Sequence, residues 1–146
     1  MKVKDCMCYE VACLTPNNTV ADCAKLMCNK HVGCIPICDN NKTIVGLVTD
    51  RDIILRTIAC DKDIKNTPIS DIMTCKVSCC GPEEDVNEAE KKMSNEQIRR
   101  LPVVDENNKI IGIVTLGDLC ANQNIDTEGV CVTLENICGS NNKNAE

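Results

Sequence analysis

Two segments of the chain place a threonine and an aspartate three residues apart, directly after a hydrophobic run. They are Gly46-Leu-Val-Thr-Asp-Arg-Asp52 and Gly112-Ile-Val-Thr-Leu-Gly-Asp118. If a helix starts after each threonine, its free N–H groups and positive end can receive a phosphate. The ionised aspartate can accept hydrogen bonds from both hydroxyls of a ribose diol. The same spacing is also a capping box that serves the helix alone, so spacing by itself leaves both interpretations open.

Motifs of catalysis are incomplete in this chain. Gly112 to Gly117 has the glycine spacing of a phosphate-binding P-loop, but Asp118-Leu119 stands where Lys and Ser or Thr are required. His31 is the one histidine, and no Ser/His/Asp or Cys/His set forms around it. The sequence therefore predicts a protein that is not an enzyme and uses no cofactor.

Fourteen cysteines in 146 residues form the most unusual feature of the composition. Disulfide scaffolds of secreted proteins have such a density, but the first residues lack the apolar stretch of a signal peptide. Cys6-x-Cys8, Cys79-Cys80, Cys34-x3-Cys38 and the pair Cys131 and Cys138 leave a metal- or redox-responsive protein open as an alternative, although no Cys-x-x-Cys occurs. A metal site is not predicted.

Charge and aromatic content argue against several partners. The net charge is −6 and Tyr9 is the one aromatic residue, so neither nucleic acid nor an anionic membrane surface is an expected partner. No apolar run approaches the ~20 residues of a membrane span. We expect a cytoplasmic protein.

The chain contains an internal sequence repeat of two copies. A shift of 66 residues aligns Lys2–Ile54 with Pro68–Cys120 without a gap, and 17 of the 53 paired positions are identical. At several cysteine positions the other copy has a small or apolar residue, as in Cys23/Ala89 and Cys38/Val104. We therefore expect cysteine to fill core and half-buried positions as a small hydrophobe, in a reducing compartment.

Each copy predicts the order strand, helix, strand, strand, helix. A short first strand (11–14 and 77–80) precedes a helix with a capping box at Thr19/Asp22 or Asp85/Glu88. Strands follow at 34–38 and 44–49, and at 100–104 and 110–115, with a second helix after each threonine. One copy is too small to bury both faces of its sheet, so the copies should pack as a pseudo-twofold module.

The predicted organisation has four parts. Repeat 1 covers residues 1–60, a polar linker 61–67, repeat 2 residues 68–124, and a C-terminal tail 125–146. In the tail, Val130, Leu134 and Ile137 suggest the buried stripe of a short helix, and the polar end should be frayed.

The paired motifs resemble a tandem pair of CBS domains, a Bateman module. The resemblance rests on Asp5-Cys-Met7 and Asp71-Ile-Met73, on a proline after each first strand, on the entry to the hairpin turn, and on both Gly-x-Val-Thr-x-x-Asp segments. It implies an α/β fold of two β-α-β-β-α repeats and a regulatory module that binds AMP, ADP, ATP or S-adenosylmethionine in the cleft between the repeats, signals occupancy to a partner protein, and forms a homodimer. An interaction-only module without a ligand is the alternative.

Position by position, the resemblance assigns the Thr/Asp pairs to phosphate and ribose, the residues before the strand prolines to the pocket wall, and the first-strand entries to the base. The predicted ligand-binding residues are Cys8, Val11, Gly33, Cys34, Thr49, Arg51, Asp52, Thr74, Cys75, Val77, Arg99, Arg100, Thr115, Gly117 and Asp118. Because Arg99-Arg100 align with Gly33-Cys34, we expect a phosphorylated adenosine to prefer the site near Asp118, with Arg51 a partial substitute at the other.

Overall fold

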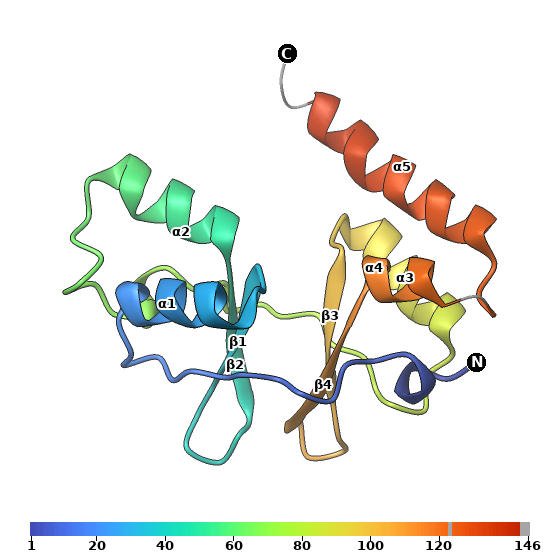
Figure 1. Cartoon of the computed structure of the whole chain (residues 1–146), viewed down its shortest axis with the longest axis horizontal. Helices are drawn as coiled ribbons and strands as arrows, with labels where there is room; N and C mark the ends of the chain where they lie inside the picture. Colours follow the sequence, from blue (N-terminus) through green and yellow to red (C-terminus); the bar gives the residue numbers. More distant parts are fainter. Residues whose placement is uncertain (123, 144–146) are drawn as a thin grey trace. The chain divides into compact units, whose positions relative to one another are not determined.

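The computed structural model describes residues 1–122 and 124–143, with side chains through residue 139. Its elements (Figure 1) confirm the α/β class, and all four hairpin strands have the predicted bounds. The elements are η1 (Val3–Asp5), α1 (Val20–Lys30), β1 (Cys34–Cys38), β2 (Ile44–Thr49), α2 (Asp50–Arg56), η2 (Ile58–Cys60), η3 (Ile69–Asp71), α3 (Val86–Glu96), β3 (Arg100–Val104), β4 (Ile110–Thr115), α4 (Leu116–Ala121) and α5 (Thr127–Lys143).

The chain forms two compact units that do not follow the order of the repeats. Unit 1 consists of Met1–Glu10, Ser78–Glu106 and Ile111–Glu146, and unit 2 of Val11–Val77 and Asn107–Ile110. The first ten residues therefore belong to the unit that contains most of repeat 2, whereas the linker and the start of repeat 2 belong to the unit built on repeat 1.

Unit 2 is built on the antiparallel hairpin of β1 and β2. Its register runs from Cys34 opposite Thr49 to Ile37 opposite Gly46. The buried core beneath the hairpin combines α1, both strands and η3: Val20, Cys23, Met27, Ile35, Ile37, Val48, Ile53, Ile69 and Ile72. The strand predicted at 11–14 is wrong, because only Leu14 pairs, in a single parallel bridge to Ile37.

Unit 1 repeats this plan with β3 and β4, and the N-terminal segment completes it. The Val3 amide donates to the Glu84 carbonyl at 2.9 Å, and Cys8 forms an antiparallel bridge with Ile113 of β4 (Figure 1). The strand predicted at 77–80 is likewise reduced to one bridge, between Cys80 and Val103. Each of these two first segments is therefore held to its hairpin through one residue, Leu14 or Cys80, and a proline follows two residues later.

The two first helices start differently. Thr19 and Asp22 form the predicted reciprocal capping box of α1. Asp85 caps α3 by accepting from the Asn87 amide, and Glu88 pairs with Lys91 at 2.7 Å, so the predicted Asp85/Glu88 box is wrong. A short carboxylate at the N-cap satisfies one amide without the second partner.

Helix α5 is 17 residues long, longer than the predicted short helix. Val130 and Ile137 are buried, as predicted, whereas Leu134 is 41% exposed. Thr133 is buried instead of Leu134. The Thr133 hydroxyl donates to Glu90 Oε1 of α3 at 3.0 Å. The frayed end predicted from Gly139 onward is wrong for residues 139–143, which continue α5, and its last part, residues 144–146, lies outside the described residues.

Within the described part of the chain, none of the helices has the length and apolar character needed to cross a membrane.

Candidate functional site

The first strand-end motif forms a complete capping box at the junction of β2 and α2. Thr49 Oγ1 accepts a hydrogen bond from the Asp52 amide at 3.1 Å, and Asp52 Oδ2 accepts one from the Thr49 amide at 3.0 Å. The Asp52 side chain is 15% exposed, so its carboxylate lies at the edge of the core. The capping box uses Asp52 Oδ2, so Asp52 Oδ1 is available to other partners.

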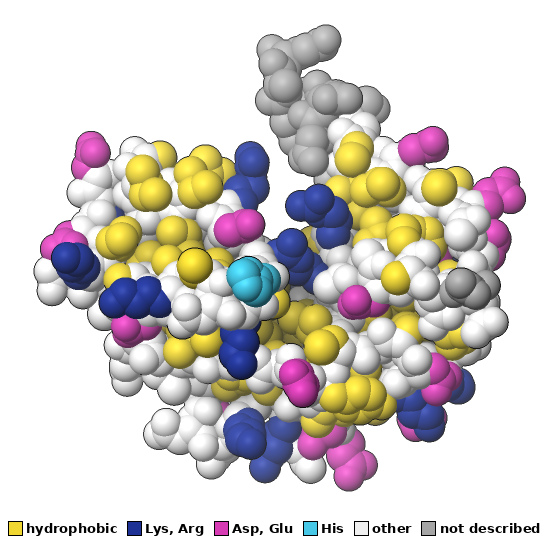
Figure 2. Space-filling view, in the orientation of Figure 1, with side chains coloured by type: hydrophobic (Ala, Val, Ile, Leu, Met, Phe, Trp, Pro, Cys, Tyr) yellow, Lys and Arg dark blue, Asp and Glu magenta, His cyan; other side chains and the backbone are white. Residues whose placement is uncertain are grey.

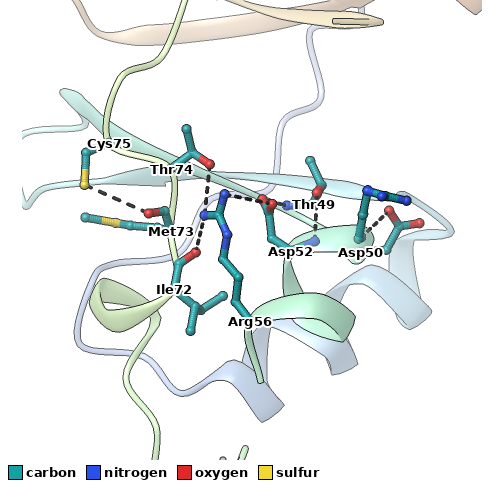
Figure 3. Close-up of polar contacts among 9 residues, drawn as sticks. Thr49, Asp50, Asp52, Arg56, Ile72, Met73, Thr74 and Cys75 are labelled. Carbon is teal, nitrogen blue, oxygen red and sulfur yellow. Dashed lines mark hydrogen bonds and ion pairs between the residues drawn. The ribbon is translucent and has the colours of Figure 1, made fainter. Parts of the chain in front are cut away.

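Arg56 is one such partner, and sequence reasoning missed it. Its Nη2 lies 3.5 Å from Asp52 Oδ1, while Nη1 donates to the Ile72 carbonyl at 2.8 Å and to Thr74 Oγ1 at 3.2 Å (Figure 3). The Asp52/Arg56 spacing of four residues on a predicted helix was an available signal for the ion pair. The two contacts to residues 72 and 74 depend on tertiary packing.

Thr74 reaches this site because its backbone joins the edge of β2. The amide and carbonyl of Thr74 pair with Leu47 at 2.9 and 3.0 Å. The glycine at position 46 eases this approach, because a Cβ there would lie 2.6 Å from Met73 Sδ and 3.3 Å from the Thr74 carbonyl. The structure therefore unites Thr49, Asp52 and Thr74, three of the predicted binding residues.

The second motif repeats the box in unit 1. The Thr115 amide and hydroxyl both donate to Asp118 Oδ2, at 2.9 and 2.8 Å, and the Asp118 amide donates to Thr115 Oγ1 at 3.1 Å. Cys8 lies beside β4 in the position that Thr74 has beside β2. Across the described residues, no ion pair reaches Asp118, and the position equivalent to Arg56 is Asn122.

The residues before the strand prolines lie at the start of each helix. The Asp50 amide donates to the Gly33 carbonyl at 3.0 Å, and the Leu116 amide donates to the Arg99 carbonyl at 2.8 Å. Arg99 is exposed and Arg100 half-buried, whereas Cys34 is buried in β1. The two copies therefore share this backbone contact and differ in the side chains beside it.

The remaining predicted residues divide between the units. Arg51 and Cys75 are exposed in unit 2, and no hydrogen bond or ion pair between described residues joins the Arg51 side chain to Asp52. Val11 and Val77 are half-buried in the same unit, and Gly117 is exposed in unit 1.

The cysteines are free thiols in a wider range of environments than expected. Four are buried and three half-buried, but seven are exposed, so the expectation that cysteine fills core and half-buried positions is wrong for half of them. The exposed residues are Cys8, Cys28, Cys60, Cys75, Cys120, Cys131 and Cys138. Of these seven, Cys8 and Cys28 align with the small polar residues Thr74 and Ser94, which suit exposed positions as well as buried ones. Cys60, Cys131 and Cys138 lie outside the aligned ranges, so the repeat carries no information about their burial.

One pair of thiols interacts directly within unit 2. A side-chain interaction with Cys38 lowers the pKa of Cys13, and the same interaction together with burial raises the pKa of Cys38. Burial is the main cause that raises the pKa of Cys23 to about 11, with the neighbouring Cys34 adding to it. Burial also raises the pKa of Cys80 to about 12, and the negative charge of Glu84 contributes in the same direction. The described residues contain no group of three or more metal-binding side chains.

Comparison with known sequences gives matches over almost the whole chain. The family model described as "CBS domain" matches residues 3–57 and 69–123. The chain is 42% identical over 139 residues to the CBS domain-containing protein YhcV of Bacillus subtilis (strain 168), a match that covers 95% of this chain and 96% of that protein.

Two solved structures of similar architecture extend this result. A conserved CBS domain protein, TA0289 of Thermoplasma acidophilum, superposes with a TM-score of 0.82 at 29% identity, covering 93% of this chain and 75% of that one. The CBS domain pair of protein MJ0100, solved in complex with 5′-methylthioadenosine and S-adenosyl-L-methionine, has a TM-score of 0.76 at 30% identity, covering 83% and 98%.

Proposed function

Because this chain belongs to the CBS domain family as a tandem CBS pair, we propose that it is a non-catalytic regulatory module that binds an adenosine-containing ligand at the strand ends bearing Asp52 and Asp118. The ligand class comprises AMP, ADP, ATP and S-adenosylmethionine. Occupancy is signalled to a partner protein, and the chain acts as a homodimer in the cytoplasm.

The observation that carries this proposal is the half-buried carboxylate that each capping box holds at a strand end. In both boxes one oxygen, Oδ2, accepts the threonine amide, so the carboxylate is held in one orientation. A carboxylate fixed in this way is suited to accept two hydroxyl donors of a ribose. The complex of the MJ0100 CBS pair with two adenosyl compounds supports the choice of ligand class.

With no Phe or Trp in the chain, we propose that aliphatic side chains and the backbone, rather than aromatic stacking, hold the base of the ligand. Tyr9, the one aromatic residue, is 64% exposed, and the Tyr9 hydroxyl donates to the Lys4 carbonyl. Aliphatic side chains and the backbone of residues 8–11 and 74–77 are therefore the proposed contacts for the adenine ring.

A thermal-shift panel of AMP, ADP, ATP, S-adenosylmethionine and NAD tests the proposal. A ligand present at about 100 times its Kd adds about 2.7 kcal/mol to the free energy of unfolding, which raises the melting temperature measurably. Guanosine and cytidine monophosphates serve as controls for a general anion effect. If no adenosine compound raises the melting temperature, the ligand-binding proposal fails and an interaction-only module replaces it.

A further inference from the structure

Arg56 links three parts of unit 2 through one side chain. The guanidinium meets Asp52 Oδ1, the Ile72 carbonyl and the Thr74 hydroxyl, at 3.5, 2.8 and 3.2 Å. It thereby joins the last turn of α2 to the segment that pairs with β2. Neither strand-end motif contains this residue, and the family resemblance assigned the compensating charge to Arg51.

We propose that Arg56 is a positioning residue for ligand binding at Asp52: its planar guanidinium fixes the Asp52 carboxylate and the Thr74 hydroxyl in one arrangement. This inference rests on the proposed function, in which Asp52 receives the ribose. Arg56 acts through these two side chains and makes no contact with the ligand itself.

The geometry of the contacts requires a guanidinium. Nη1 donates to two oxygens, and Nη2 faces the carboxylate, so the three acceptors lie around one rigid planar fork. Lysine carries the same charge as a compact ammonium on a flexible stem and cannot reproduce the fork. Arg56 is 46% exposed, so its value lies in orientation rather than in the strength of the ion pair.

A different role for Arg56 is to supply positive charge for a phosphate. Asp50, Arg51 and Asp52 carry a net charge of −1 in the first turn of α2, and Arg56 brings the sum to zero. The two roles make opposite predictions for a ligand without a phosphate. Positioning affects adenosine and AMP equally, whereas a charge effect changes AMP binding alone.

Unit 1 provides an internal control. The residue that matches Arg56 is Asn122, whose amide group lies 3.6 Å from Met1 Sδ. No guanidinium joins α4 to residues 6–8 among the described contacts of this unit. Substitutions at Arg56 should therefore leave binding at the Asp118 site unchanged.

The test is calorimetric titration of adenosine and AMP into full-length Asp118→Ala protein, with and without Arg56→Lys. We expect Arg56→Lys to weaken both ligands by about tenfold and to leave the ratio of their Kd values unchanged. Lys25→Ala removes an exposed charge from α1 of the same unit and should change neither Kd. Thr74→Val removes one of the three contacts and should weaken both ligands by a smaller factor.

The melting temperatures of the unliganded variants show whether a variant is misfolded. A lysine at position 56 can still pair with Asp52, so we expect Arg56→Lys to melt close to the wild type, and a loss of affinity then reports a loss of positioning. Unchanged affinity in Arg56→Lys, or a loss confined to AMP in Arg56→Ala, would overturn the inference. It also fails if Asp118→Ala binds neither ligand while the wild type binds both, a result that leaves the proposed function standing. Absence of binding to the wild type removes the proposed function itself.

Discussion

The strand ends at Asp52 and Asp118 have the same capping box and different charged neighbours. At Asp52 the neighbour is Arg56, four residues later on the same helix. At Asp118 the equivalent position is Asn122; Arg99 meets the start of α4 through its backbone carbonyl, and Arg100 begins β3. The box starts a helix in both units, whereas the surrounding side chains are free to differ. The comparison indicates that the capping box builds the strand-to-helix junction, whereas the side chains around it are the ones that can select a ligand.

The largest expected difference concerns phosphorylated ligands. Asp118→Ala should raise the Kd of the tighter AMP site by about 100-fold, because two charge-assisted hydrogen bonds are lost beside a basic pair. Asp52→Ala should affect only the weaker site, which lacks that pair. Two-site calorimetry with AMP measures both values, and Asp→Asn at each position controls for loss of the capping box. Equal losses in the two alanine variants would contradict the asymmetry.

Replacing Gly46 and replacing Gly112 should lower the free energy of unfolding by different amounts. Both positions have a flexible methionine sulfur nearby, Met7 Sδ at 2.8 Å for position 112 and Met73 Sδ at 2.6 Å for position 46, but the backbone carbonyl is closer at position 112 (Cys8, 2.9 Å) than at position 46 (Thr74, 3.3 Å). A side chain can move more easily than backbone, so we expect Gly112→Ala to lower the free energy of unfolding by about 3 kcal/mol and Gly46→Ala by about 1 kcal/mol. Urea unfolding measures both. A larger loss of unfolding free energy in Gly46→Ala than in Gly112→Ala would contradict this expectation and show that residues 73–74 are less able to move.

The smallest expected effect is on thiol reactivity. Cys13 and Cys79 occupy equivalent, half-buried positions, but the pKa of Cys13 is lowered by its interaction with Cys38 and the pKa of Cys79 is raised by burial. Only the thiolate reacts, so at about pH 7.5 iodoacetamide should alkylate Cys13 about threefold faster. Cys38→Val places in unit 2 the residue found in unit 1 and should abolish the difference. Mass spectrometry at short times reads the two rates, and equal wild-type rates would refute the assignment.

The local features of the fold follow from the sequence. The hairpin strands have their predicted bounds because each β-prone run ends at an Asp/Asn-rich turn, and Thr49 and Thr115 begin helices because their boxes are satisfied within four residues. The first strands were overestimated because β-propensity describes a residue's fit to a sheet and does not supply a partner strand.

The non-local features did not follow from the sequence. Alignment of the repeats shows that residues 2–8 and 68–74 play equivalent roles, but it does not show which hairpin each segment joins. The reach of Arg56 to residues 72 and 74 depends on that choice. Likewise, the stripe in the tail predicted Val130 and Ile137 but not Thr133, whose burial depends on Glu90 of α3.

The assignment of residues 1–10 to unit 1 sets an order of events during synthesis. Val3 and Lys4 donate to the backbone of Glu84 and Pro82, which leave the ribosome about 80 residues later, and Val130 and Ile137 of the same core come later still. At about 5–20 residues per second, the first segment waits for several seconds before its partners exist. Unit 2 has all its residues by position 110. Residues 1–10 are therefore made before unit 2 but gain their partners after it, and a nascent chain halted before residue 82 carries Val3 and Met7 without the core that covers them.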